Sequence, residues 1–417
     1  MAKARRVEIS TVYAGKNISG QINRFMKSFT YDDVASGASD SVSISLRDDE
    51  KLWMGAWYPG KGDRMTSSVA FINWYKDDSR RVLHCGSFQV DDLSFNGRPN
   101  TGTIKAVSVP QSSSFNAEER TKTWESVTVA QIAEEIAKRA GIELYYEAES
   151  ISIKSIEQDA QTDCKFLYSL CQAYGLAMKV YANKIVIFDE EKYEKKAAVL
   201  TIRESDMESW SYDTTIAGTY TGATFAFTDP NDEQEYAIDI GGGDRILTIN
   251  VTADSIHDAE LKGIAKLNNE NKKDTTMSVT IMANPAIVAG ITVQIAELGK
   301  LNGKYYVDKV RTKVAGGSKS TMTLTLHRVT ARIKNASVRA VEAIKEEKKA
   351  EGTQYTIVSG DTLWGIARRF LGKGVRYVEI YNLNKDVIEA AAKAHGKSSS
   401  SNGHWIWPGT VLTIPAA

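Results

Sequence analysis

Carboxylates and histidines are the side chains of this chain that could transfer protons. A glycosidase needs two carboxyl groups at a set separation across the bond that it breaks. Asp91 lies beside Asp92 and Glu190 beside Glu191, but adjacency in sequence does not fix that separation in space. The five histidines lie far apart and match no metal-binding motif: His84, His257, His327, His395 and His404. We therefore predict no catalytic residue and no metal site, and interpret these histidines as surface or strand residues.

Cysteines and a glycine-rich stretch are the other candidates for chemistry. Cys164 and Cys171 are seven residues apart on a predicted helix, too far for a disulfide, and neither they nor Cys85 belong to a nucleophile motif. Residues 241–244 are rich in glycine but lack the lysine and hydroxyl residue of a phosphate-binding loop. The cysteines are expected in the core and the glycines in a turn. No cofactor is expected.

Composition limits the class of protein. The 417 residues are too many for one ordinary core and indicate about three domains. The 52 basic and 52 acidic residues balance, which argues against specific nucleic acid binding. No apolar run is long enough to cross a membrane, and the first residues lack the apolar core of a signal peptide. We therefore expect synthesis in the cytoplasm without the usual export route.

Residues 1–115 and 196–330 have the two-residue period of β-strands. In the first region, Val42, Ile44 and Leu46 alternate with serines, and turn-forming residues separate the runs. Short strands with such turns predict a barrel or sandwich in each region. Five aromatic residues occur close together in the first region: Trp53, Trp57, Tyr58, Trp74 and Tyr75. They could stack on sugars or bases, but core packing and a subunit interface are the commoner roles.

Residues 116–195 change to a helical period. Thr128 and Gln131 fit a capping box, and the apolar stripe that follows stops at Gly141. A strand comes next, then a second helix from about Asp163 and a hairpin. This region is predicted to be a compact α+β unit.

The C-terminal part contains a charged spacer and a small module. Residues 331–352 are rich in Ala, Lys and Glu and predict a helical linker. Residues 353–417 predict a strand from Tyr355, a helix from Leu363 to Gly372, a second helix and a closing strand.

This module resembles a LysM domain. The resemblance rests on residues 355–364, on Ile366 with Ala367, on residues 381–384 and on the ending 408–415. It implies a βααβ fold that binds polymers containing N-acetylglucosamine, chiefly peptidoglycan and chitin, between two loops. The residues that match those loops are Gly360, Asp361, Thr362, Leu363, Ile406, Trp407, Pro408 and Gly409.

One stretch departs from the LysM pattern. Between Lys385 and Trp405 the chain inserts an Ala-rich segment followed by four serines, where the family has a shorter connection. The insertion alters one wall of the groove. The alternative to sugar binding is therefore a LysM fold that serves as a protein-docking or spacer module.

The preceding part of the chain resembles a second family. Residues 161–171, Gly175 and the hairpin after it are similar to the tail hub proteins of contractile phages and phage-like bacteriocins. The same pattern occurs in the late-control D family and in type VI secretion spike proteins. The resemblance covers residues 1–330 and implies two barrel-like β domains flanking a small α+β unit. It also implies a homotrimer that joins the tail tube protein to the spike.

Together these observations predict an α+β, mainly β protein with five parts: 1–115, 116–195, 196–330, the linker 331–352 and the LysM domain 353–417. The resemblances imply a structural, non-enzymatic hub in the tail baseplate of a virion or phage-like particle, assembled in the bacterial cytoplasm. Its expected partners are tube, spike and other baseplate proteins, with peptidoglycan a candidate ligand. Two alternatives stay open: a peptidoglycan hydrolase with an unrecognised catalytic domain, and a soluble carbohydrate-binding adaptor.

Overall fold

The computed structural model describes residues 3–108, 114–230, 232–315, 320–341 and 352–415. The chain forms two units, Met1–Thr224 with Asp239–Ala336, and Phe225–Ile238 with Ser337–Ala417. The fold is α+β and mainly β, as predicted. None of the helices in the described part of the chain is long and apolar enough to span a membrane.

A single large sheet contains both predicted β regions. Among the described residues it has thirteen strands in the order β14-β18-β21-β20-β3-β4-β7-β6-β5-β1-β2, and β19 pairs with both β13 and β20. From the N-terminus, its strands are β1 (Arg6–Tyr13), β2 (Lys16–Asn17), β3 (Met26–Val34), β4 (Ser41–Arg47), β5 (Arg64–Ile72), β6 (Arg80–Asn96), β7 (Thr101–Val107), β13 (Thr201–Arg203), β14 (Met207–Thr214), β18 (Thr275–Met282), β19 (Thr292–Ala296), β20 (Gly303–Ala315) and β21 (Thr321–Arg328).

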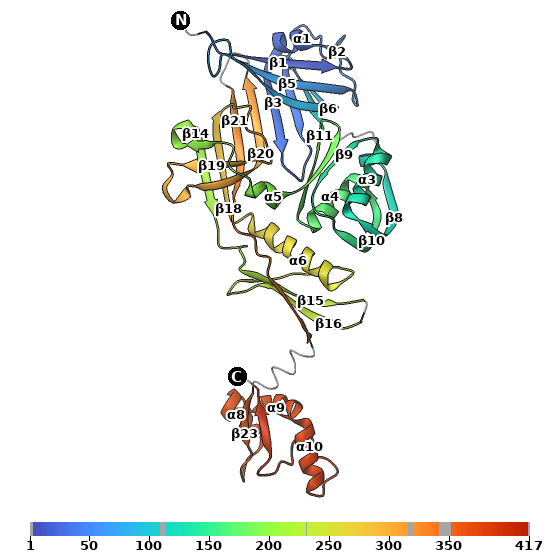
Figure 1. Cartoon of the computed structure of the whole chain (residues 1–417), viewed down its shortest axis with the longest axis vertical. Coiled ribbons are helices and arrows are strands. Elements are labelled where there is room, and N and C mark those ends of the chain that lie inside the picture. Colours follow the sequence, from blue (N-terminus) through green and yellow to red (C-terminus); the bar gives the residue numbers. More distant parts are fainter. Residues whose placement is uncertain (1–2, 109–113, 231, 316–319, 342–351, 416–417) are drawn as a thin grey trace. The chain divides into compact units, whose positions relative to one another are not determined.

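The two β regions meet at β3 and β20, which lie side by side in Figure 1. These strands pair antiparallel, with Tyr31 opposite Thr312. Backbone hydrogen bonds therefore join regions that are almost 300 residues apart in sequence, so the sheet continues from one predicted β domain into the other.

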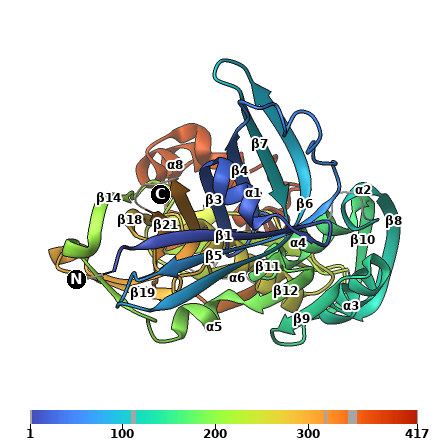
Figure 2. The same ribbon diagram turned by 90° about the horizontal axis from the view of Figure 1, so that it is seen from above.

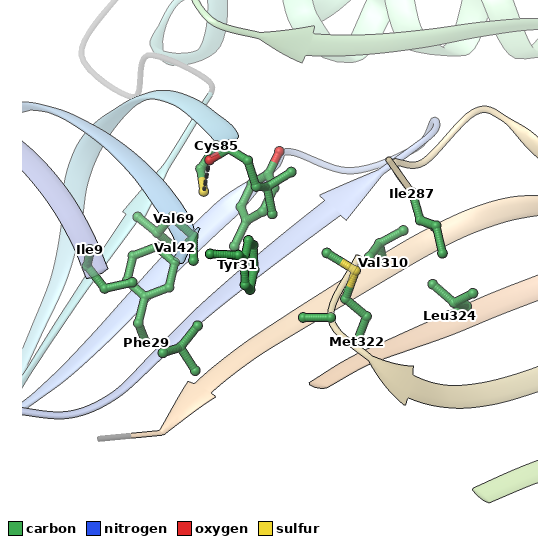
Figure 3. Packing of buried hydrophobic residues seen from close by; sticks show 14 of the residues in the cluster. Ile9, Phe29, Tyr31, Val42, Val69, Cys85, Ile287, Val310, Met322 and Leu324 are labelled. Carbon is green, nitrogen blue, oxygen red and sulfur yellow. Dashed lines mark hydrogen bonds between the residues drawn. The ribbon is translucent and has the colours of Figure 1, made fainter. Parts of the chain in front are cut away.

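Strand alternation explains the core of this sheet. Val42, Ile44 and Leu46 are at most 1% exposed, whereas the serines between them are half-buried. The three apolar residues belong to one hydrophobic cluster that extends from β1 to β21. Figure 3 shows part of it, with Phe29 on β3 and Leu324 on β21 among the labelled side chains. Burial of each large apolar side chain contributes about 1.5 to 3 kcal/mol.

The α+β unit folds as predicted around its own core. Thr128 and Gln131 form the capping box of α3, and Gly141 ends that helix in the left-handed conformation at φ 65°. Figure 2 shows α3 beside the long antiparallel pair of β8 and β10. The elements are α2 (Ser114–Ala117), β8 (Glu119–Thr128), α3 (Val129–Ala140), β9 (Glu143–Glu147), β10 (Ser152–Thr162), α4 (Asp163–Ala173), β11 (Leu176–Tyr181), β12 (Lys184–Asp189) and α5 (Glu190–Lys195).

Buried ion pairs attach the α+β unit to the sheet. The Lys179 Nζ on β11 lies 2.7 Å from Asp33 Oδ1 and 3.3 Å from Asp40 Oδ2. The other Asp33 oxygen accepts a hydrogen bond from the backbone N–H of Ala289 at 2.8 Å. Asp33 therefore contacts all three of the predicted hub regions.

The remaining described elements include the helix α6 (Ile256–Asn271), and one of them, β22, corrects the prediction of a helical linker. Residues 336–340 of the predicted helical linker form strand β22, and its residues 342–351 lie outside the described residues. Strand pairing of β22 with β16 satisfies backbone groups there and outweighs the helical composition of the segment. These elements are α1 (Ser19–Phe25), η1 (Glu204–Asp206), β15 (Gly222–Thr228), β16 (Glu235–Gly241), β17 (Ile246–Thr248), α6 (Ile256–Asn271), η2 (Gly299–Leu301) and β22 (Ala336–Ala340).

Within the second unit, residues 353–415 form the predicted module with one helix added. Thr362 caps α8, because its hydroxyl accepts from the Gly365 N–H at 3.0 Å, and Gly372 ends that helix in the left-handed conformation. The extra helix is α10, in the Ala-rich insertion. The elements are β23 (Thr353–Thr356), α8 (Leu363–Leu371), η3 (Gly374–Arg376), α9 (Tyr377–Leu383), α10 (Lys385–Ala394) and β24 (Val411–Ile414).

Candidate functional site

The first predicted loop is shaped by an internal carboxylate. Asp361 Oδ2 accepts hydrogen bonds from the Tyr355 hydroxyl at 2.8 Å and from the Val358 N–H at 2.9 Å. Gly360 takes the turn at φ 94°, where a side chain would be strained. Leu363 is only 2% exposed and belongs to the core of the module. Asp361 and Leu363 therefore support the loop, while the backbone at Gly360 is exposed.

The second predicted loop is tied directly to the first. The Gly409 N–H donates to the Ile357 carbonyl at 2.8 Å, and the Ile357 N–H donates to the Thr410 carbonyl at 2.9 Å. Pro408 and Gly409 are exposed. The structure thus brings the two predicted sets of site residues together, with apolar faces and backbone amide groups at the surface. Such groups suit a neutral sugar, because amides can bond an acetamido group without any charge.

The insertion is held by hydrogen bonds and packs against the first loop. The Glu389 carboxylate on α10 accepts from the Ser400 N–H at 3.0 Å, from the Ser400 hydroxyl and from the Tyr381 hydroxyl at 2.9 Å. A Cβ on Gly403 would lie 2.3 Å from Leu363 Cδ1, so the inserted turn packs closely on a residue of the first loop. The insertion therefore contacts a residue of the first predicted loop.

The hydrogen-bonded carboxylate of Glu389 should make the stability of this module sensitive to acid. Hydrogen bonds from Ser400 and Tyr381 lower the pKa of Glu389 to about 2. A depressed pKa stabilises the fold above the unfolded value, and that stabilisation is lost as pH falls through the folded value. We expect the hydrogen-exchange protection factor of the Ser400 amide, which is corrected for the intrinsic effect of pH, to fall between about pH 4.5 and 2, and to fall less in Glu389→Gln. Equal acid sensitivity in both proteins would contradict this role.

Three tryptophans of the module, Trp364, Trp405 and Trp407, have different surroundings. Trp407 is stacked on His395, with ring centroids 5.0 Å apart and planes 2° apart. Trp405 lies under the Lys397 ammonium at 4.6 Å, and Trp364 contacts Tyr377. His395 and Lys397 were not among the residues predicted to form the sugar-binding loops. The helical spacing of Ile388 and Ala392 would have predicted α10 and placed both residues just beyond its end.

The candidate catalytic groups are mostly engaged in ion pairs. Asp92 pairs with Lys105 at 2.9 Å, and Glu190 pairs with Arg332 and Lys272. Among the described residues, no group of three or more His, Cys, Asp or Glu side chains could hold a metal ion.

His327 was expected at the surface or in a strand, and it lies buried in β21. Its ring nitrogens face Asp308 at 2.8 Å and Glu194 at 3.2 Å. Burial alone would lower the pKa of His327, but these carboxylates outweigh burial and raise it. The two acids therefore favour the protonated form of this buried histidine. All three cysteines are free, as predicted.

A mainly β part and a small βααβ module after it make up the described chain, and each is similar to known proteins. Residues 355–389 match the LysM domain family. The chain is 28% identical over 217 residues to the probable baseplate hub protein of Escherichia phage P2, covering 50% of this chain and 53% of that protein. The probable baseplate hub protein of Escherichia phage 186 is 23% identical over 215 residues, with 50% and 53% covered.

The fold is also similar to a solved tail protein. The 43 kDa tail protein of prophage MuSo2 from Shewanella oneidensis superimposes with a TM-score of 0.60 at 13% identity, covering 78% of this chain and 98% of that one. The predicted resemblance to baseplate hub proteins with a C-terminal LysM domain is thereby confirmed. The chain spans about half the length of the curated relatives that it matches.

Proposed function

We propose that this chain is the structural baseplate hub of a contractile tail or phage-like injection particle. It joins the tail tube to the spike as a homotrimer, and it assembles in the bacterial cytoplasm. The observation that carries the proposal is a hub-like fold over most of the chain followed by a LysM domain. In this proposal, residues 1–115, 116–195 and 196–330 form the ring and residues 353–417 contact the wall.

An exposed sheet edge supports assembly with other copies. β14 is the terminal strand of the large sheet, and its Trp210 is 41% exposed. Open edges with apolar side chains tend to pair with other chains unless they are blocked. We place a subunit contact at this edge.

The first test uses particles released when the producing bacterium lyses. Tail-like assemblies would be purified by sedimentation and labelled with antibody-gold against this chain. Label at the tail tip is expected. A chain that stays free in the lysate would contradict the hub and favour the adaptor.

We also propose that the LysM domain binds peptidoglycan through the two loops. The ligand contacts are expected at Gly360, Ile406, Trp407, Pro408 and Gly409, with Asp361, Thr362 and Leu363 holding the loops in shape. Support comes from the hydrogen bonds that bring the two loops together.

Trp407→Ala is predicted to weaken binding to purified sacculi up to about tenfold, because an aromatic contact contributes about 0.5 to 1.5 kcal/mol beyond the area that it buries. Co-sedimentation of the full chain with sacculi measures this loss. Val375→Ala, at an exposed residue outside the loops, is the control and should bind normally. Unchanged binding by Trp407→Ala would favour the docking or spacer role.

The hydrolase alternative has a direct test. A hub should release no soluble muropeptides from purified cell wall during prolonged incubation. Release that persists in a highly purified chain would favour the enzyme.

A further inference from the structure

The inserted segment of the LysM domain presents a surface outside the two loops. Its exposed side chains combine positive charge with aromatic rings, and Trp405 alone is 45% exposed. They are Lys393, His395, Lys397, His404 and Trp405.

Backbone hydrogen bonds hold two residues of this surface, Lys397 and Trp405, in place. The Lys397 N–H donates to the Ala392 carbonyl at the end of α10 at 2.9 Å, and the Trp405 N–H donates to the Ser400 carbonyl at 2.9 Å. Ser400 is itself anchored to Glu389. The Lys397 ammonium consequently lies 4.6 Å from the centre of the Trp405 ring. An ammonium and an indole are thus presented together by a fixed turn.

The charge of the module differs from that of the whole chain. Residues 353–417 contain seven lysines and arginines against four aspartates and glutamates, whereas the full sequence is balanced. Three of the four acids are used internally: Asp361 shapes its loop, Glu379 pairs with Arg376 at 2.8 Å and Glu389 holds Ser400. The module therefore presents a net positive surface.

These two groups match two features of an acidic wall polymer. An indole face packs on a sugar ring, and an ammonium pairs with a carboxylate. Peptidoglycan offers free carboxylates on its stem peptides beside the sugar rings. Chitin offers the rings alone. A surface with both groups therefore favours the acidic polymer.

We propose that the inserted segment is a second subsite, in which Trp405 packs against the glycan and Lys397 pairs with a carboxylate of peptidoglycan. This inference rests on the proposed sugar binding by the loops. It assigns to the insertion a preference for peptidoglycan over neutral polymers of N-acetylglucosamine.

The test compares two charge reversals in the full chain. Lys397→Glu is expected to weaken binding to purified sacculi about tenfold at low salt and to leave binding of the N-acetylglucosamine hexamer unchanged. Lys373→Glu changes the net charge equally at an exposed lysine outside the insertion, and less than a twofold loss is expected. Retained hexamer binding shows that the Lys397→Glu variant is folded.

Several results would overturn the subsite. Equal losses from the two reversals would mean that only net charge matters, and a loss of hexamer binding with Lys397→Glu would mean a general defect. If the effect disappears once sacculi are stripped of phosphate-containing polymers, a phosphate and not a carboxylate is the partner. Failure of Trp407→Ala to weaken binding to either polymer would instead refute the loop site itself.

Discussion

Lys179→Ala is expected to destabilise the first unit by about 3 to 5 kcal/mol, the cost of breaking a buried ion pair by removing one partner. The side chains of Lys179, Asp33 and Asp40 are 13%, 6% and 0% exposed. Without the ammonium, two carboxylates would face each other with little water to solvate them. The measurement is the urea midpoint of the full chain, followed by circular dichroism.

The loss should depend on pH in a defined direction. Burial raises the pKa of Asp40, and the Lys179 charge opposes that rise. In Lys179→Ala the opposition is gone, so the folded pKa rises further above the unfolded one. A raised folded pKa gives stability that is present at low pH and is lost as pH rises through it. The variant should therefore lie nearer to the wild type at pH 4 than at pH 8.

Two further variants make this prediction falsifiable. Lys105→Ala removes a pair whose side chains are about half exposed and should barely move the midpoint. Combining Lys179→Met with Asp33→Asn and Asp40→Asn removes all three charges and should recover most of the loss. A small effect of Lys179→Ala at pH 8 would show that this cluster does not hold the α+β unit on the sheet.

The strong local signals in the sequence predict much of the fold. The ends of α3 can be predicted from Thr128 with Gln131 at its start and from Gly141 at its end. A capping box and a left-handed glycine each act within a few residues. The alternation at Val42 and Ile44 predicts a strand with one buried face for the same reason. The two loops of the LysM domain could be recognised because their turn residues are local as well.

What the sequence does not predict depends on distant partners. β8 and β10 pair along their length, but most of their side chains are polar, so no clear period of two distinguishes them from loops. The joining of β3 to β20 depends on backbone hydrogen bonds, which side-chain patterns do not encode. In the sequence, Lys179 is one of many charged residues in predicted strands. Its role follows only from its contacts with Asp33 and Asp40, which are distant in sequence.

The insertion has both kinds of feature. Ile388 and Ala392 have the spacing of one helix face, so the sequence contains a signal that predicts α10. The hydrogen bonds from Ser400 to Glu389 and the packing of Gly403 on Leu363 are tertiary contacts. They show why the longer connection orders the site.

A pair of glycines tests how much that packing contributes. Gly396 and Gly403 both lie in the insertion in the left-handed conformation, at φ 77° and 78°. A Cβ on Gly396 would meet nothing within 4 Å, whereas one on Gly403 would lie 2.3 Å from Leu363 Cδ1 and 3.0 Å from Tyr381 Cδ2. The two alanine variants therefore have the same backbone strain and differ in steric contact.

Gly396→Ala should cost about 1 to 2 kcal/mol of local stability, and Gly403→Ala a further 1 to 3 kcal/mol because the core must move. Hydrogen exchange across residues 353–415 of the full chain measures both losses. Gly403→Ala should also weaken sacculus binding more than Gly396→Ala does, since Leu363 belongs to the first predicted loop and begins α8. Equal exchange in the two variants would mean that the inserted turn only covers the domain. A larger effect at Gly403, with exchange in the first unit unchanged, would show that the turn supports the binding loop.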